Sequence, residues 1–201
     1  MHPAIYREFE RICSHRTITG SVLEVGATPT NSALLCMASL RNVTEKVGVD
    51  LNGPYEYRDF KIVQCNANTL ECFGDGRFDA VLCNATLEHD PYFWRTIEAI
   101  KRVTRPGGQI IIGVPGYVKL RVEIIGETLR RIPLLCNLER SGYFNGLFCS
   151  TLTYQVHNYP GDYYRFSEQT MKEVMLDGCE DIEMRTIMVP PRIIGVGRKR
   201  V

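Results

Sequence analysis

The sequence predicts one α/β domain, in which a doubly wound, mostly parallel sheet of seven strands ends in an antiparallel hairpin. Three observations predict this fold. Short apolar runs alternate with segments of helical period along most of the chain, an order that is typical of βαβ units. The length of 201 residues suits a single domain with a full core. Little more than Pro190 and Pro191 separates the last two apolar runs, which is too short for a crossover helix, so these two strands should pair antiparallel.

The expected elements follow one another in chain order. A helical lead-in over residues 1–20 precedes strands at 22–26, 46–50, 61–65, 78–83, 109–114, 182–189 and 192–197. Helices are expected at 28–40, 91–104 and 167–177, with Thr28 and Ser167 as N-caps and Pro29 at a first helical position. A single domain, 1–201, with a lid-like insertion at about 115–161, is therefore expected to have a Rossmann-like fold. In such a sheet the ligand lies at the carboxyl ends of the strands.

The composition argues against several classes of function. A formal net charge of +1 gives no overall field that would attract nucleic acid, so none is expected as a partner. The eight cysteines form no C-x-x-C pair and no zinc-site spacing, and we expect free thiols in a reducing compartment and no metal site. The sequence shows neither an apolar signal core nor a transmembrane segment, which predicts a cytoplasmic location.

Small and polar residues follow the first four strands and should meet at one edge of the sheet. Gly26 ends the first strand, and Asp50 ends the second, 24 positions later. A carboxylate at that place can accept hydrogen bonds from both ribose hydroxyls of a nucleoside cofactor. The amide of Asn66, after the third strand, could bind a base edge. The candidate cofactor-binding residues are Glu24, Gly26, Ala27, Asp50, Leu51, Asn66, Ala67, Asn84 and Ala85.

A phosphate-bearing cofactor is disfavoured by the same segment. A G-x-G-x-x-G fingerprint that begins at Gly26 would need glycines at positions 28 and 31, where this chain has Thr28 and Asn31. No G-K-[ST] sequence occurs, so a P-loop is absent as well. These features argue against a nicotinamide oxidoreductase and mildly favour S-adenosylmethionine, a nucleoside cofactor without phosphates.

Five segments in order resemble the class I S-adenosylmethionine-dependent methyltransferases, across roughly residues 22–199. The segments are 22–26 (VLEVG), 47–50 (VGVD), 78–89 (FDAVLCNATLEH), 100–108 (IKRVTRPGG) and 162–167 (DYYRFS). The resemblance implies methyl transfer from S-adenosylmethionine to an oxygen or nitrogen of a small-molecule, sugar or lipid-linked acceptor. The chain departs from the family pattern in two places. Ala27-Thr28-Pro29-Thr30 stands where the family has a glycine-rich loop, and Asn66 stands where it has an aspartate.

The resemblance and the residue types together suggest roles for the remaining polar side chains. Glu24 is expected beneath the amino-acid end of the cofactor, where it orders the loop. His89 is a candidate general base if the acceptor is a hydroxyl, and packing of the loop is the alternative. Asp90, just before a proline, is expected to cap a helix.

The segment before the last helix is a candidate for the mouth of the substrate site. Tyr163, Tyr164 and Arg165 could line that mouth. The alternative is that Arg165 pairs locally with Asp162 while Phe166 fills the core.

The insertion carries one apolar helical stripe over 118–132, together with four basic and two acidic residues. We expect it to pack over its own domain as a lid on the active site, and the alternatives are a contact with a second copy or another partner and a position on a membrane surface. The altered loop 27–30 and Asn66 keep a second function open, a non-catalytic binding or regulatory protein with the methyltransferase fold.

Overall fold

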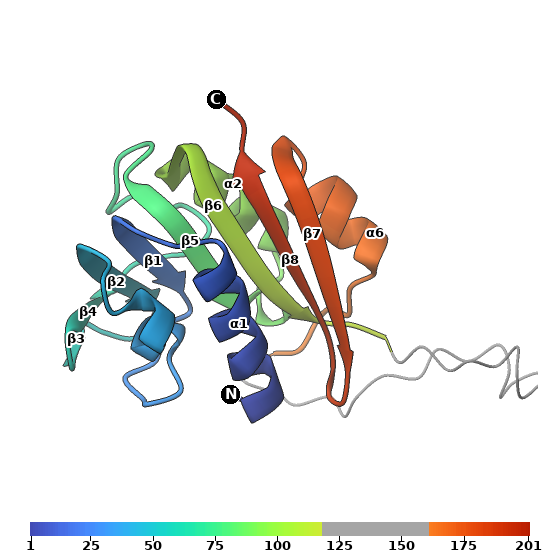
Figure 1. Cartoon of the computed structure of the whole chain (residues 1–201), viewed down its shortest axis with the longest axis horizontal. Coiled ribbons are helices and arrows are strands. Elements are labelled where there is room, and N and C mark those ends of the chain that lie inside the picture. Colours follow the sequence, from blue (N-terminus) through green and yellow to red (C-terminus); the bar gives the residue numbers. More distant parts are fainter. Residues whose placement is uncertain (118–160) are drawn as a thin grey trace, which may run out of the picture.

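The computed structural model describes residues 1–117 and 161–201, which form one mixed α/β layer structure (Figure 1). The stripe at 118–132 and nearly all of the expected insertion at 115–161 lie outside the described residues. The sheet has the order β3-β4-β2-β1-β5-β6-β8-β7. Its strands are β1 (Ser21–Val25), β2 (Glu45–Asp50), β3 (Tyr55–Tyr57), β4 (Phe60–Gln64), β5 (Phe78–Asn84), β6 (Thr104–Pro115), β7 (Cys179–Met188) and β8 (Pro191–Lys199).

The predicted fold class is confirmed by the pairing of these strands. β4, β2, β1, β5 and β6 run parallel, and β8 and β7 close the sheet as an antiparallel hairpin beside β6. The described sheet has eight strands instead of the expected seven, because β3 adds a short antiparallel edge next to β4. β3 has only three residues, all of them at least partly exposed, so it leaves no apolar run in the sequence.

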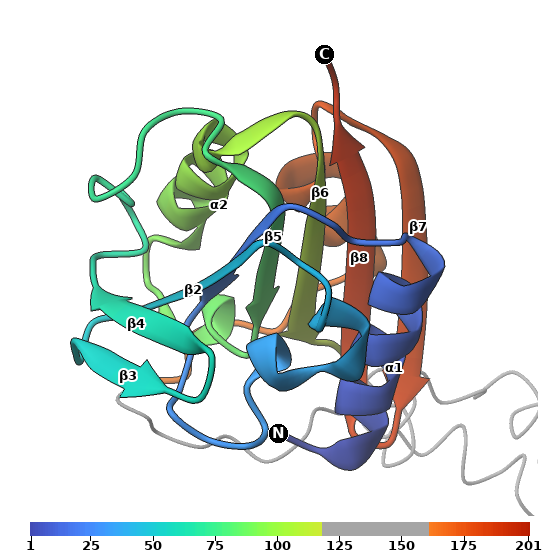
Figure 2. The same cartoon turned by 60° about the vertical axis from the view of Figure 1, so that its left-hand side comes forward.

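Helices cover the two faces of the sheet (Figures 1 and 2). Helix α1 (Pro3–His15) packs on one face and contributes Ile5, Phe9 and Ile12 to the core there. Helix α2 (Phe93–Val103) packs on the other face. On the same face as α2 lie α6 (Glu168–Thr170) and the following π-helical turn, η4 (Met171–Met175). The Ser167 side chain accepts a hydrogen bond from the Thr170 amide at 3.0 Å, so the expected N-cap is confirmed.

The regular helix expected at 28–40 is wrong. Two single 3₁₀ turns replace it, η1 (Leu34–Cys36) and η2 (Ala38–Leu40). Thr28 caps no helix, because its hydroxyl bonds the Thr30 hydroxyl and its carbonyl accepts from the Thr30 amide in a tight turn. Tertiary bonds outcompete the local helical pattern in this loop.

The expectation of free thiols is wrong for Cys65 and Cys72, which form a disulfide with their Cα atoms 6.5 Å apart. A turn in which the Leu70 amide donates to the Asn66 carbonyl at 2.8 Å brings the two cysteines together. Among the described cysteines, the free thiols are Cys13, Cys36, Cys83 and Cys179.

Within the described part of the chain, no helix is long and apolar enough to span a membrane.

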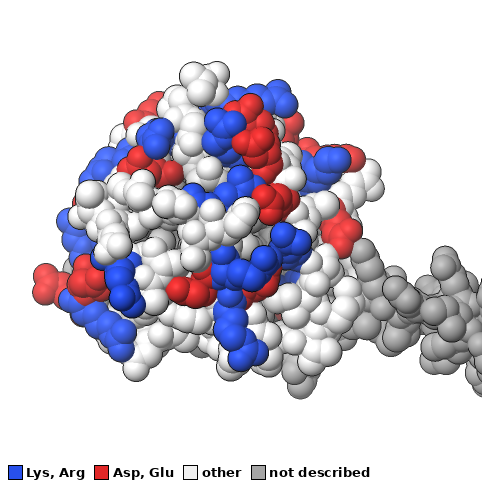
Figure 3. All heavy atoms as spheres, viewed as in Figure 1, with Lys and Arg blue, Asp and Glu red and all other residues white. Residues whose placement is uncertain are grey.

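The surface that carries α1, β8 and β7 mixes charges of both signs (Figure 3). Ion pairs join the helix to the edge strand there: the Arg16 guanidinium lies 2.7 Å from Glu183, and Arg185 lies 3.9 Å from Glu8. Interspersed charges of this kind agree with a net charge close to zero and give this face no single-sign field.

Candidate active site

The carboxyl ends of four parallel strands meet at one edge of the sheet. Val25 of β1 lies opposite Val49 of β2 on one side and Cys83 of β5 on the other. Asp50 of β2 lies opposite Gln64 of β4. The residues that follow these positions therefore share the edge where the strand order reverses, which is the usual ligand position in an open α/β sheet.

The turn after β1 brings Gly26 and Ala27 against β2. Both amides donate to the Val49 carbonyl, at 2.9 and 3.0 Å. Gly26 has a φ of +77°, and a Cβ there would lie 2.1 Å from Oγ1 of Thr86. The glycine is thus required by a left-handed turn and by the close approach of a side chain of this protein. The two N–H groups are already used within the chain.

Glu24 organises the loop that follows this turn. Its buried carboxylate accepts hydrogen bonds from the amides of Leu34 and Leu35, each at 3.0 Å. Burial raises the pKa of Glu24 from 4.5 to about 7, against the opposing effect of these two hydrogen bonds. The loop-ordering role expected for Glu24 matches this geometry.

Asp50 ends β2 with a half-buried carboxylate. Its Oδ1 accepts hydrogen bonds from the backbone amide of Asn52 at 2.8 Å and from the Asn52 side chain at 3.1 Å. Among the described residues Oδ2 has no hydrogen-bond partner, so one oxygen shapes the loop and the other is available. The neighbouring Leu51 side chain is 67% exposed at the rim.

The loop after β4 is held mainly by its own amides. Oδ1 of Asn66 accepts from the Asn68 amide at 2.9 Å, and Ala67 packs against the core beneath. The Asn68 side chain then donates to Asp90 at 2.6 Å and to Thr96 at 2.8 Å. Sequence reasoning missed Asn68, although the run Asn-Ala-Asn directly after a strand was a visible sign of a polar turn.

Asp90 is not the N-cap residue of α2, which is Tyr92. It acts just upstream, because its Oδ1 accepts from the Tyr92 amide at 2.8 Å and its Oδ2 accepts from the Thr96 hydroxyl at 2.7 Å. Asp90 therefore anchors the start of the helix, as a structural carboxylate.

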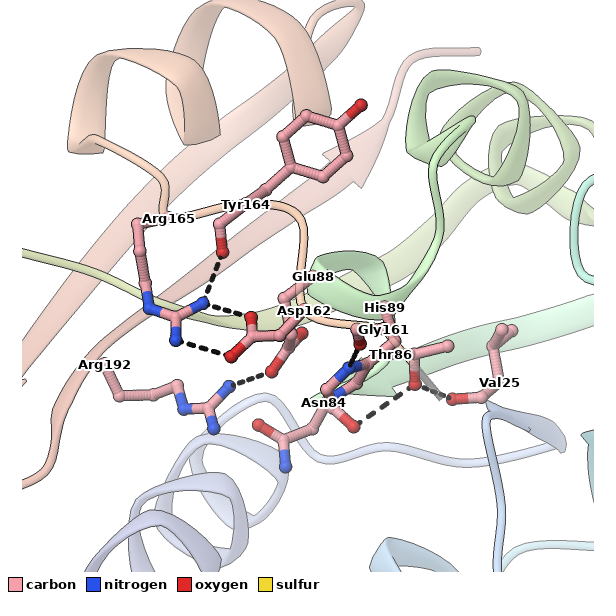
Figure 4. A network of polar contacts seen from close by, with 10 residues as sticks. All are labelled: Val25, Asn84, Thr86, Glu88, His89, Gly161, Asp162, Tyr164, Arg165 and Arg192. Carbon is pink, nitrogen blue, oxygen red and sulfur yellow. Dashed lines mark hydrogen bonds and ion pairs between the residues drawn. The ribbon is translucent and has the colours of Figure 1, made fainter. Parts of the chain in front are cut away.

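Beyond β5 the chain makes a sharp turn into the site (Figure 4). Ala85 has a φ of +56° and donates its amide to the Gly113 carbonyl at 3.1 Å. The Thr86 hydroxyl bonds the carbonyls of Val25 and Asn84, at 3.2 and 3.3 Å. Asn84 is 9% exposed, and its Oδ1 is buried without a hydrogen-bond partner. A buried acceptor in this state needs a donor from outside the described protein atoms.

His89 ties this turn to the segment that returns at Gly161. Its backbone amide donates to the Thr86 carbonyl at 3.0 Å, and its Nδ1 contacts the Gly161 carbonyl (Figure 4). Because a carbonyl only accepts, this contact favours the tautomer with hydrogen on Nδ1 and the lone pair on Nε2.

Of the residues expected to bind substrate, two are held by local contacts and one is exposed. Arg165 forms a two-point ion pair with Asp162, with one contact at 2.7 Å, and this pairing raises the pKa of Arg165. Phe166 is buried, so the local-pairing alternative describes these residues. Tyr163 is 56% exposed, whereas the Tyr164 hydroxyl donates to the Pro91 carbonyl at 2.9 Å and points away from the Arg165 guanidinium (Figure 4).

A second buried ion pair, which sequence reasoning missed, lies in the same region. Arg192, at the start of β8, donates to Glu88 at 3.1 Å, and Glu88 is fully buried. The backbone carbonyl of Glu88 also accepts from the Tyr163 amide at 2.8 Å. Nothing in the sequence pairs positions 88 and 192, because β8 reaches β5 only through the intervening β6.

Within residues 1–117 and 161–201, no group of acidic, His or Cys side chains could hold a metal ion.

Fold and site together define an open α/β protein whose polar side chains gather at the carboxyl edge of the sheet, where such folds bind ligands. Residues 23–112 match the family model described as a methyltransferase domain. An uncharacterized methyltransferase of Mycobacterium sp. (strain JLS) is 33% identical over 98 residues. That match covers 46% of this chain and only 37% of the relative, so the chain spans well under half of that protein.

Solved structures extend the likeness to nearly the whole chain. The 1,6-didemethyltoxoflavin-N1-methyltransferase of Burkholderia thailandensis, solved with its substrate and S-adenosylhomocysteine, has a TM-score of 0.65 and 19% identity, covering 98% of this chain and 79% of that one. The N-methyltransferase NodS of Bradyrhizobium japonicum, solved with S-adenosylhomocysteine, has a TM-score of 0.60 and 9% identity, with 98% and 86% covered. Residues 23–112 therefore resemble a methyltransferase domain, and nearly the whole chain shares the fold of these S-adenosylmethionine-dependent methyltransferases.

Proposed function

We propose that this protein transfers a methyl group from S-adenosylmethionine to an oxygen or nitrogen of a small-molecule, sugar or lipid-linked acceptor. One observation carries the proposal: at the point where strand order reverses, Asp50 presents a carboxylate oxygen beside the turn at Gly26 and Ala27. A carboxylate there binds the hydroxyls of a ribose. The relatives solved with S-adenosylhomocysteine support the same cofactor.

The residues present fit such a cofactor at two further points. Glu24 accepts hydrogen bonds from the amides of Leu34 and Leu35, so the loop after β1 is ordered without a ligand. Ala67 would line the region of the base, and Asn66 would offer its remaining polar atoms there.

The work of the protein in this reaction is positioning and exclusion of water. The cofactor supplies an already activated methyl group, so a nucleophile held in line needs little further chemical help. For a hydroxyl acceptor, His89 would serve as the general base, with its ring oriented by the Gly161 carbonyl. Tyr163 would contact the acceptor at the exposed rim.

Calorimetric titration with S-adenosylmethionine and S-adenosylhomocysteine tests the proposal. The wild type should bind both, and Asp50→Ala should bind S-adenosylhomocysteine about tenfold to a hundredfold more weakly, because two ribose hydroxyls lose their charged acceptor. Glu56→Ala, which removes a carboxylate from exposed strand β3, is the matched control and should leave binding unchanged.

A second candidate is a non-catalytic binding protein with the same fold. It is favoured by the internal use of the Gly26 and Ala27 amides and of Oδ1 of Asn66. Wild-type protein that binds neither ligand in the titration would support this second candidate and contradict the enzyme.

A further inference from the structure

The buried pair of Glu88 and Arg192 has no part in the proposed reaction and is incompletely satisfied. One hydrogen bond joins Nη1 of Arg192 to Oε1 of Glu88. The other carboxylate oxygen, Oε2, and Nε of Arg192 are both buried without a partner. Glu88 is 0% exposed, and an unsatisfied charged atom at such depth costs free energy unless some group binds it.

Asn84 brings a third unpartnered atom to the same place. Asn84 of β5 lies opposite Gly113 of β6, and Arg192 of β8 lies opposite Pro115, two residues further along β6. Positions two apart on a strand share one face, so Asn84 and Arg192 flank β6 on the same face. Figure 4 shows the Asn84 amide, the Arg192 guanidinium and the Glu88 carboxylate turned toward a common region.

Gly113 leaves the space that the Asn84 amide occupies. A Cβ at position 113 would lie 2.5 Å from Oδ1 of Asn84 and 2.9 Å from the ring of Phe9. Any side chain there would therefore displace the Asn84 amide. Arg192 forms the accessible end of the pair, because 13% of its side chain is exposed whereas only 1% of the Glu88 side chain is.

We propose that Glu88, Arg192 and Asn84 recognise an amino group that sits beside a hydrogen-bond acceptor atom, as in a primary carboxamide or an aminopyrimidine edge. The two N–H groups would donate to Oε2 of Glu88 and Oδ1 of Asn84, and the acceptor atom would accept from Nε of Arg192. Two acceptors and one donor in the protein match the two donors and one acceptor of that ligand group. The site binds part of the methyl acceptor, and to that extent the inference rests on the proposed function.

The charges select a neutral ligand group. The charges of Glu88 and Arg192 cancel, and so do those of Asp162 and Arg165. The second pair lies beside the first, because the Tyr163 amide donates to the Glu88 carbonyl. A carboxylate or phosphate would meet Glu88, and an ammonium or amidinium would meet Arg192, each without compensation. A neutral carboxamide satisfies all three atoms without adding a charge.

Four probes that share one ring test this recognition. Benzamide carries the proposed group, N,N-dimethylbenzamide lacks its donors, benzoate is an anion and benzamidine is a cation. Titrations followed by the Nε–H resonance of Arg192 in NMR spectra report binding at the site itself. We expect benzamide to bind wild type at least about tenfold more tightly than each of the other three.

Single substitutions should reverse the charge preference. Glu88→Gln leaves Arg192 uncompensated, so benzoate should become the preferred probe. Arg192→Gln leaves Glu88 uncompensated, so benzamidine should become preferred, as followed by backbone amide resonances. Arg198→Gln is the control, because Arg198 lies on the same strand in an exposed pair with Asp181 and should leave the preference unchanged.

A double variant keeps the test decisive if either single variant fails to fold. Glu88→Leu combined with Arg192→Met replaces the whole pair by apolar side chains of similar size, a change that buried ion pairs often tolerate. Its affinity for benzamide should fall about tenfold or more. An unchanged affinity, or an unchanged charge preference in the single variants, would overturn the inference.

Titration of the same samples with S-adenosylhomocysteine separates the two proposals. Wild type that binds S-adenosylhomocysteine but no benzamide would refute the recognition site and leave the proposed function standing. Wild type that binds benzamide next to Arg192 but not S-adenosylhomocysteine would refute the proposed function and leave a binding site.

Discussion

The raised pKa of Glu24 makes a specific prediction about stability and pH. The carboxyl is buried under the loop after β1 and accepts hydrogen bonds from the amides of Leu34 and Leu35. Its folded-state pKa of about 7 exceeds the unfolded value of 4.5, so the folded protein binds the proton more tightly. The resulting stabilisation is therefore fully present below pH 4.5 and is lost as the pH rises through about 7.

The magnitude follows from the two pKa values. A rise from 4.5 to about 7 corresponds to about 3 kcal/mol in total, most of which is lost between about pH 5 and pH 8. Glu24→Gln keeps the size and polarity of the side chain and removes the titration. The free energy of unfolding of wild type minus that of the variant should therefore fall by about 2 to 3 kcal/mol over this range.

Urea denaturation of both proteins at several pH values between about 5 and 8 measures this difference. Other titrating groups cancel because they are common to both chains. Glu98→Gln, which changes an exposed carboxylate on α2, should give a difference that does not vary with pH. A constant difference for Glu24→Gln would contradict this prediction, since Glu24 would then titrate alike in the folded and unfolded states.

Two further substitutions test local geometry by urea denaturation. Gly26→Ala should lower the free energy of unfolding by about 3 kcal/mol, because it combines a left-handed φ with a clash against Thr86. Adding Thr86→Ala should restore part of that loss and leave about 1 kcal/mol for the strained backbone. No recovery in the double variant would contradict the clash. Ser167→Ala should cost about 1 kcal/mol by removing the cap of α6, whereas Ser167→Asp should retain most of the stability, and equal losses in both variants would contradict the capping role.

The pattern of apolar runs was sufficient for the arrangement of most strands. Parallel pairing of β1, β2, β4, β5 and β6 follows from buried runs separated by crossover segments, and the hairpin of β7 and β8 follows from the short link at Pro190. The pattern failed at residues 28–40, where an apolar helical period is real but the Glu24 carboxylate takes up two amides that a helix would have used.

Within the candidate site, the sequence was informative about residues whose role depends on their own strand. Asp50 and Asn84 could be placed at strand ends from local runs alone, and Gly26 could be placed at a turn. Their contacts could not be predicted from local runs. The bond from Asn52 to Asp50, the approach of Thr86 to Gly26 and the lack of a partner for Oδ1 of Asn84 all depend on the folded arrangement of strands and turns.

The sequence alone was enough to predict the order of the buried strands, the family resemblance and the set of polar residues at the carboxyl edge. Each of these depends on near neighbours in the chain, where periodicity and spacing carry the information. The folded chain was needed to show that Arg192 contacts Glu88, that Cys65 bonds Cys72 and that Asn68 donates to Asp90. Arg192 and Glu88 are 104 residues apart, and Asn68 and Asp90 are 22 apart, so neither contact leaves a periodic pattern in the sequence. Cys65 and Cys72 are only seven residues apart, but an irregular turn, which has no period of its own, brings them together.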